Sequence, residues 1–348
     1  MADQNIEVES MIYKFKENRV RRAYTGGMKI DKFKGKTDCK NGRTPEEWLA
    51  STVTAFNPDM IIENEGLSIC ENGQFFKDLI AKNPDAILGK GNGESLAILV
   101  KLLDSAERLV IQCHPTIQFA KEQFGSSFGK TECWYMLDCD EDACVYLGFK
   151  EGITKEKWQE YFYNQDIDGM LNSLHKFPVK NGDLWFVAGG VPHAIGGGCM
   201  MIELQEPSDL MVIPERVTPA GIKLNDSKLH GGLGFDKMFD CFVYNGYSEE
   251  EIKEKYYRKA EFCDNKATPI VDETLTECFS MNGLKVKDIA EIDLGRRYAI
   301  GVITEGQVEI SDALDRFSFK KGDSFFITAD SGRMHFKGDC KIVLCSNR

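Results

Sequence analysis

VKNGDLWFVAGGVPHAIG, at residues 179–196, has a counterpart later in the chain, FKKGDSFFITADSGRMHFKG, at residues 319–338. Each copy contains a lysine, a Gly-Asp turn, a four-residue apolar strand, a turn of small residues and then a histidine. The spacing from Gly182 to His193 differs by two residues from that between Gly322 and His335. We interpret the repeat as a duplicated β-hairpin unit, which predicts two related antiparallel barrels in a mainly β protein.

The surrounding segments extend this β pattern. Residues 98–103 (ILVKLL) and 108–115 (RLVIQCHP) are expected to form two strands joined by a short turn, as are residues 131–137 and 143–149. The segment 301–310 (GVITEGQVEI) predicts a further strand, glycine turn and strand. Between about residues 151 and 175 the apolar period becomes helical, which predicts a helical insertion.

The length of 348 residues favours two domains. The charged segment at about 245–265 is the expected boundary, because it carries little apolar pattern. We therefore predict a first domain at 1–250 that contains the helical insertion, and a second at 251–348.

The charge of the chain limits its partners. Its formal net charge is −12, and no block rich in Lys or Arg interrupts the acidic background, which argues against nucleic acid and anionic membranes. The first twenty residues contain no apolar signal-peptide core, and the 12 cysteines are scattered without a CxxC pair. We expect a cytoplasmic protein with reduced thiols, and the oligomeric state stays open.

Three segments carry residues that could bind a metal. If IQCHP is a strand, Gln112 and His114 lie on one face. Glu132 follows Lys130 by two residues, and His193 follows a Gly-Gly-Val-Pro turn. Two histidines, a carboxylate and an amide oxygen suit zinc, although such a set tolerates other divalent metals. A single strand histidine is more often not a ligand, so the prediction rests on the combination.

Four ordered motifs then resemble a known family. QCHP, GKTECWY, GDLWFVAGGVPHAIGGG and MIELQEPSD, within about residues 95–210, are similar to the type I mannose-6-phosphate isomerases. The resemblance implies a zinc-dependent protein of two cupin (jelly-roll) barrels with the helical insertion in the first. It places the zinc ligands at Gln112, His114, Glu132 and His193, and active-site residues at Lys130 and Glu203.

One position departs from the family pattern. The family has an arginine four residues after the aspartate that matches Asp209, and here that residue is Ile213. The nearest substitute is Arg216, which we expect the Pro214 turn to direct toward the metal as a third catalytic residue. The alternative is that the site lacks this group, which leaves the substrate in doubt. The second copy keeps only His335 and is expected to be a barrel without metal.

The resemblance implies an aldose–ketose isomerase that interconverts mannose 6-phosphate and fructose 6-phosphate through a zinc-stabilised enediol or enediolate. We favour Glu203 as the general base, with Lys130 acting on a sugar oxygen or as an alternative base. Three competing hypotheses remain: an isomerase of a different or unphosphorylated sugar, a non-catalytic zinc-containing sugar-binding cupin, and an iron oxygenase.

Overall fold

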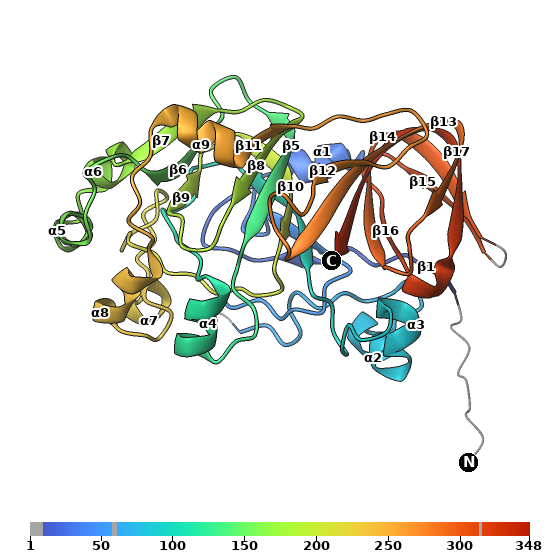
Figure 1. The fold of residues 1–348 in the computed structure, drawn as a ribbon, viewed down its shortest axis with the longest axis horizontal. Helices are drawn as coiled ribbons and strands as arrows, with labels where there is room; N and C mark the ends of the chain where they lie inside the picture. Colours follow the sequence, from blue (N-terminus) through green and yellow to red (C-terminus); the bar gives the residue numbers. More distant parts are fainter. Residues whose placement is uncertain (1–9, 58–60, 313–314) are drawn as a thin grey trace, which may run out of the picture.

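The computed structural model describes residues 10–57, 61–312 and 315–348. Figure 1 shows two β-rich lobes side by side, with most helices on the outside. The described residues form two seven-stranded sheets and one three-stranded sheet. The predicted mainly β fold is therefore confirmed.

The first lobe contains two of the sheets. In spatial order, the larger one consists of β11 (Tyr257–Lys259), β8 (Asp183–Val187), β5 (Glu132–Cys139), β10 (Cys199–Gln205), β4 (Leu99–Ser105), β3 (Glu46–Leu49) and β2 (Arg19–Val20). The smaller one consists of β7 (Leu174–Pro178), β6 (Cys144–Phe149) and β9 (His193–Ile195).

The second lobe is built on the other seven-stranded sheet. Its order is β1 (Ile12–Tyr13), β16 (Ser324–Ile327), β14 (Ala299–Ser311), β17 (Arg333–Asn347), β13 (Phe279–Asp293) and β12 (Thr268–Val271), with β15 (Arg316–Lys320) paired to β14. The chain leaves the first lobe's sheet after Lys259 and enters this one at Thr268, whereas β1 joins it from the start of the chain. The division at residue 250 stays a prediction.

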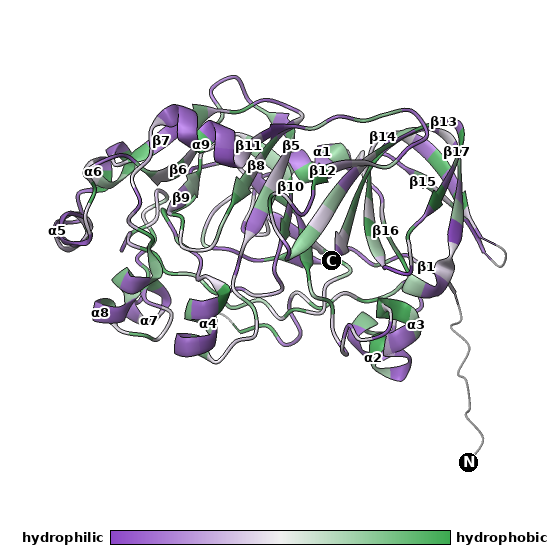
Figure 2. Cartoon of the chain, viewed as in Figure 1, coloured by the Kyte–Doolittle hydropathy of each residue, from purple (hydrophilic) through white to green (hydrophobic). Residues whose placement is uncertain are grey.

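The helices are short and peripheral. They are α1 (Met28–Phe33), α2 (Phe76–Lys82), α3 (Pro84–Leu88), α4 (Ile117–Phe124), α5 (Lys155–Asn164), α6 (Ile167–Asn172), α7 (Asp226–Leu229), α8 (Phe235–Met238) and α9 (Glu249–Tyr256), with 3₁₀ turns η1 (Phe239–Cys241) and η2 (Ala329–Ser331). Helices α5 and α6 lie between β6 and β7, which confirms the helical insertion. Figure 2 shows the hydrophilic colour on α9 and α5. No helix in the described parts is long and apolar enough to cross a bilayer.

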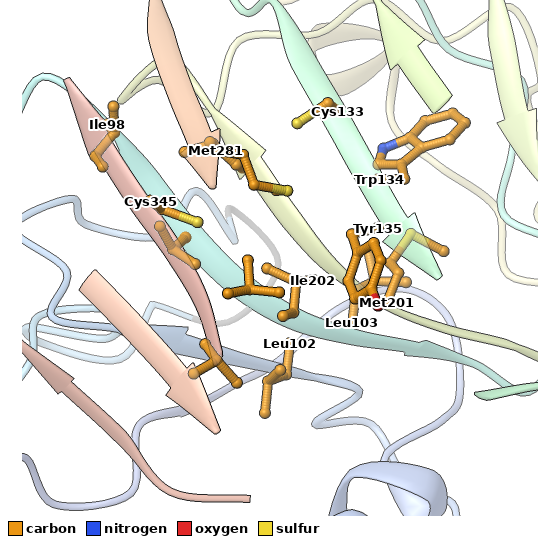
Figure 3. Packing of buried hydrophobic residues seen from close by; sticks show 14 of the residues in the cluster. Ile98, Leu102, Leu103, Cys133, Trp134, Tyr135, Met201, Ile202, Met281 and Cys345 are labelled. Atoms are coloured by element: carbon orange, nitrogen blue, oxygen red, sulfur yellow. The ribbon is translucent and has the colours of Figure 1, made fainter. Parts of the chain in front are cut away.

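The two lobes share a hydrophobic core. Because side chains alternate along a strand, Cys133, Leu102 and Ile202 lie on the face of the first lobe's sheet opposite to Glu132 and Glu203. Figure 3 shows this face packed against Met281 and Cys345 of the second lobe, and all of these apolar residues are buried in one cluster. The opposite face of the sheet carries Glu132 and Glu203 beside apolar side chains such as Trp134.

The sequence repeat has the same turn in both copies. Lys180 donates its backbone N–H to Asp183 Oδ2 at 2.8 Å, and Lys320 does the same to Asp323 at 2.8 Å. The strands that follow, β8 and β16, do not pair with the later strands β9 and β17 that carry the histidines. The predicted hairpin is therefore wrong, because the turn of small residues carries the chain to another sheet in the first copy and across β14 in the second.

The segment 301–310 is also not a hairpin. It lies within the single strand β14, whose pairing with β17 shifts between Ile303 and Glu305. Gly306 has φ of +73°, and a Cβ there would lie 2.0 Å from the carbonyl oxygen of Asp339. The glycine thus permits a bulge and a close approach of β17 rather than a reversal of the chain.

Residues 108–115 do not form the regular strand that we expected. Gln112 bridges to His193 on one side, and Cys113 bridges to Val212 on the other. Only β4 of the expected pair is a regular strand, because this segment divides its backbone hydrogen bonds between two neighbours.

Candidate active site

The register of three strands gathers polar side chains on one face of the first lobe's sheet. Glu203 of β10 lies directly opposite Lys101 of β4, and Gln205 lies opposite Glu132 of β5. Residues 203 and 205 point to the same face because they are two apart. Glu132, Lys101 and Glu203 therefore converge on the face that points away from the second lobe.

Three of the predicted ligands come together at this face. The ligand atoms of His114, Glu132 and His193 all lie within 4.8 Å of one another, and the three residues are buried. His114 Nε2 is 3.3 Å from Glu132 Oε2, and His193 Nε2 is 3.4 Å from Glu132 Oε1. Segments distant in the sequence thus supply a compact set of metal-binding atoms.

The hydrogen bonds of the two imidazoles fit a metal site. His114 Nδ1 is 2.9 Å from the carbonyl oxygen of Leu210, and His193 Nδ1 is 2.9 Å from that of Val191. A carbonyl only accepts, so both Nδ1 atoms carry the proton and each Nε2 presents a lone pair. His193 Nε2 and Glu132 Oε2 are buried without a hydrogen-bond partner. This donor set is the one expected for a divalent metal.

The protonation states agree with this fit. Burial, followed by the charge of Lys130, lowers the pKa of His114 to about 3. Burial acts to raise the pKa of Glu132, but His114 and Lys130 hold it well below its usual value. Neutral imidazoles and an ionised carboxylate are the forms that coordinate a metal.

Gln112 and Lys130 lie beside these three residues. The backbones of Gln112 and His193 exchange two hydrogen bonds of 2.9 Å, so the two residues are direct neighbours. Lys130 Nζ lies 3.0 Å from His114 Nε2 and 3.5 Å from Glu132 Oε2. Gln112 and Lys130 line a cavity of about 400 Å³, which Glu203 also lines. A small polar ligand in this cavity can therefore reach both residues and Glu203.

Glu203 belongs to a buried network of charged side chains that we did not predict from the sequence. Lys101 Nζ is 2.9 Å from Glu203 Oε1 and 3.8 Å from Glu46 Oε2. Arg22 in turn donates to Glu46 and, through both terminal nitrogens, to Asp209. One signal was present in the sequence, because Lys101 interrupts the apolar run ILVKLL. The partners of Lys101 could not be predicted from the sequence.

Burial and pairing act in opposite directions in this network. Burial raises the pKa of Glu203, while Lys101 counteracts that rise. Burial disfavours the charged form of Lys101, but Glu203 and Glu46 raise its pKa above the ordinary value. Lys101 is therefore a buried cation at neutral pH, held next to the carboxylate.

Arg216 is not brought to this site, contrary to our expectation. Its guanidinium pairs with Asp226 at 2.8 Å and lies over the rings of Phe162 and Phe235, and it does not line the cavity. Ile213 does line the cavity and is buried. Arg216, two residues after Pro214, thus lies outside the cavity, where aromatic rings and a carboxylate bind it.

His335 of the second copy differs from its counterpart His193. It is half exposed and lies 3.4 Å from Glu291 Oε1. Among the described residues it does not belong to a group of potential metal ligands.

Comparisons with known proteins agree with this fold. Residues 273–347 match the family model described as mannose-6-phosphate isomerase, cupin domain. The mannose-6-phosphate isomerase of Streptococcus mutans is 26% identical over 333 residues, which cover 94% of this chain and 96% of that protein. The mannose-6-phosphate isomerase ManA of Bacillus subtilis is 26% identical over 284 residues, covering 80% of this chain and 85% of its own length.

Solved structures share the fold over nearly the full length. The crystal structure of mannose 6-phosphate isomerase from Bacillus subtilis superimposes with a TM-score of 0.73 at 22% identity, covering 97% of this chain and 99% of that one. A zinc-bound mannose 6-phosphate isomerase gives a TM-score of 0.72 at 15% identity, covering 97% and 100%. In its ordered motifs, its cupin-domain match and these relatives, the chain is therefore similar to the mannose-6-phosphate isomerases over nearly its full length.

Proposed function

We propose that this protein is a zinc-dependent aldose–ketose isomerase that interconverts mannose 6-phosphate and fructose 6-phosphate. One observation carries the proposal: the buried group of His114, Glu132 and His193 adjoins a cavity that Lys130 and Glu203 also line. A metal-binding group and proton-transfer groups at one small cavity are what this reaction requires. The names of the relatives supply the substrate.

His114, Glu132 and His193 would hold the zinc, with Gln112 as the fourth ligand from the neighbouring chain segment. When bound, the metal supplies Lewis-acid polarisation of the sugar's carbonyl oxygen. The inward-facing lone pairs of both imidazoles and the unpartnered Glu132 oxygen support this assignment. Trp134 donates to Glu132 Oε1 at 3.1 Å and thereby fixes the carboxylate.

Glu203 is the proposed general base. The reaction needs the proton on C2 removed and returned at C1, and Glu203 faces the cavity without serving as a metal ligand. Lys101 holds the Glu203 carboxylate in place and favours its ionised form. Lys130 then assists at a sugar oxygen, or serves as the alternative base.

A second candidate is an isomerase of an unphosphorylated sugar. Ile213 favours it, because an apolar residue stands where the family has an arginine and Arg216 does not reach the cavity. The discriminating experiment measures isomerisation by the zinc-loaded protein with mannose 6-phosphate and with mannose, using the Glu203→Gln variant as the inactive control. A higher kcat/KM for mannose would replace the phosphorylated substrate in the proposal.

The cellular setting of this activity also remains a proposal. A cytoplasmic location and the lack of a nucleic-acid partner rest on the sequence alone.

A further inference from the structure

If the proposed function is right, the phosphate of the substrate needs a cation at the cavity. Ile213 is apolar and cannot supply one, so another residue must. Lys130 lies among the metal-binding atoms, and Lys101 is bound to Glu203. Arg22 donates through Nε to Glu46 and through Nη1 and Nη2 to Asp209, so both edges of its guanidinium are engaged. These three cations already have partners in the site.

Arg108 also lines the cavity and is held differently. Its Nη1 and Nη2 donate to the two carboxylate oxygens of Glu215 at 2.6 and 2.9 Å, and Nη1 also donates to the carbonyl oxygen of Leu109. A guanidinium has five N–H donors, and these bonds use three. The remaining two, on Nε and Nη2, share one edge, and in the described parts of the chain no hydrogen bond to that edge is formed.

Glu215 makes this arrangement rigid. Its side chain is 1% exposed, and its Oε1 also accepts the backbone N–H of Ile111 at 2.5 Å. The carboxylate therefore holds the guanidinium of Arg108 close to the backbone of Ile111. Gln112 is the next residue and lies four residues after Arg108. An extended chain of that length spans at most about 14 Å, a distance that a long arginine side chain and a hexose phosphate can bridge together.

We propose that Arg108, oriented by Glu215, is the phosphate-binding residue that determines specificity for a phosphorylated sugar in this protein. The proposal rests on the proposed function and deepens it. Two parallel N–H groups on one guanidinium edge match two phosphate oxygens. Lys228, which is half-buried, lines the same cavity.

The test compares Arg108→Gln and Arg108→Lys with wild type on mannose 6-phosphate and on mannose. Because Arg108→Gln leaves the buried Glu215 without its cation, the double variant Arg108→Gln/Glu215→Gln provides a neutral pair of amides. Arg333→Gln is the matched control, since Arg333 is an exposed arginine whose carboxylate partner, Glu291, lies outside the cavity. Thermal unfolding checks that each variant is folded.

We expect Arg108→Gln and the double variant to lower kcat/KM for mannose 6-phosphate at least about tenfold, mainly through KM, with mannose turnover changed less than about threefold. Arg108→Lys should recover only part of the loss, because an ammonium cannot make the two-point contact. Equal losses on both sugars, or a double variant that behaves like wild type, would overturn the assignment.

Binding gives a readout that does not depend on turnover. In the Glu203→Gln background, calorimetric titration with mannose 6-phosphate should show at least about tenfold weaker binding when Arg108→Gln is added, a difference of about 1.4 kcal/mol. If adding Arg108→Gln left the affinity for mannose 6-phosphate unchanged, the role of Arg108 would be refuted, whatever the activity of the wild-type enzyme. A wild-type protein that binds mannose 6-phosphate through Arg108 but does not isomerise it would instead refute the proposed function alone.

Discussion

Lys101 and Glu203 face each other across β4 and β10, and the lysine ammonium lies 2.9 Å from the carboxylate that borders the cavity. Both side chains are buried, so this ion pair is screened little by solvent. The pair sets the charge of the proposed base. It also ties that base to Glu46 and, through Arg22, to Asp209.

Replacing Lys101 should change the pH dependence of the reaction. Lys101 lowers the pKa of Glu203 against the effect of burial, so Lys101→Met should raise that pKa further. A general base must be ionised, and the acid limb of the pH profile of kcat/KM should therefore move to higher pH. Lys157→Met, at an exposed lysine paired with Glu160, is the control. An acid limb that stays in place would separate Lys101 from the base.

The same pair should be visible in stability. Lys101→Met leaves a carboxylate buried without its cation, which typically costs about 3–5 kcal/mol. Glu203→Gln added to Lys101→Met should recover part of this loss, and urea unfolding of the two single variants and the double variant measures the coupling. Additive losses would mean that the contact contributes nothing to stability.

Glu203→Gln should fold and keep its metal while activity falls by about 10²–10⁴-fold, the range for general acid–base groups. The amide retains the shape of the side chain but cannot accept the proton. Steady-state kinetics with mannose 6-phosphate and metal analysis of the same preparation check both parts. Turnover close to that of wild type would remove Glu203 from the mechanism.

The purified protein should contain about one zinc per chain, since a four-ligand site with two histidines and a carboxylate suits this ion. His114→Ala/His193→Ala should lose it, because both imidazoles present Nε2 to the same carboxylate. His335→Ala is the control from the second copy, where the histidine is half exposed, and should keep the zinc. Elemental analysis that finds full zinc in the double variant would contradict the ligand set.

Gly306→Ala should destabilise the second lobe more than Gly295→Ala does. Both glycines have positive φ, which costs about 1–2 kcal/mol for alanine, but a Cβ at Gly295 meets nothing within 4 Å. At Gly306 the Cβ would lie 2.0 Å from the Asp339 oxygen, and the clash adds about 1–3 kcal/mol. Urea unfolding compares the two variants, and equal effects would mean that β14 and β17 separate easily.

Several strands, helices and turns, and part of the candidate site, could be predicted from the sequence because they depend on local chemistry. The two short apolar segments at residues 131–137 and 143–149 predicted β5 and β6, and the helical period predicted α5 and α6. The repeated Lys-x-Gly-Asp motif gave equivalent turns at Lys180 and Lys320, because the aspartate binds the nearby backbone N–H in both. The same ordered motifs pointed to His114, Glu132 and His193, which the structure brings together.

Tertiary structure alone decided the remaining features. The sequence 301–310 contains a glycine that suits a turn, but contact with β17 made it a bulge in one strand. Arg216 was near the expected position in sequence, yet Asp226 and two aromatic rings bind it outside the cavity. Lys101 and Glu203 are 102 residues apart and meet only through the register of β4 and β10. Strand alternation and turn chemistry act over a few residues, so a single sequence reveals them, whereas ion pairs between distant segments depend on a register that only the packed sheet fixes.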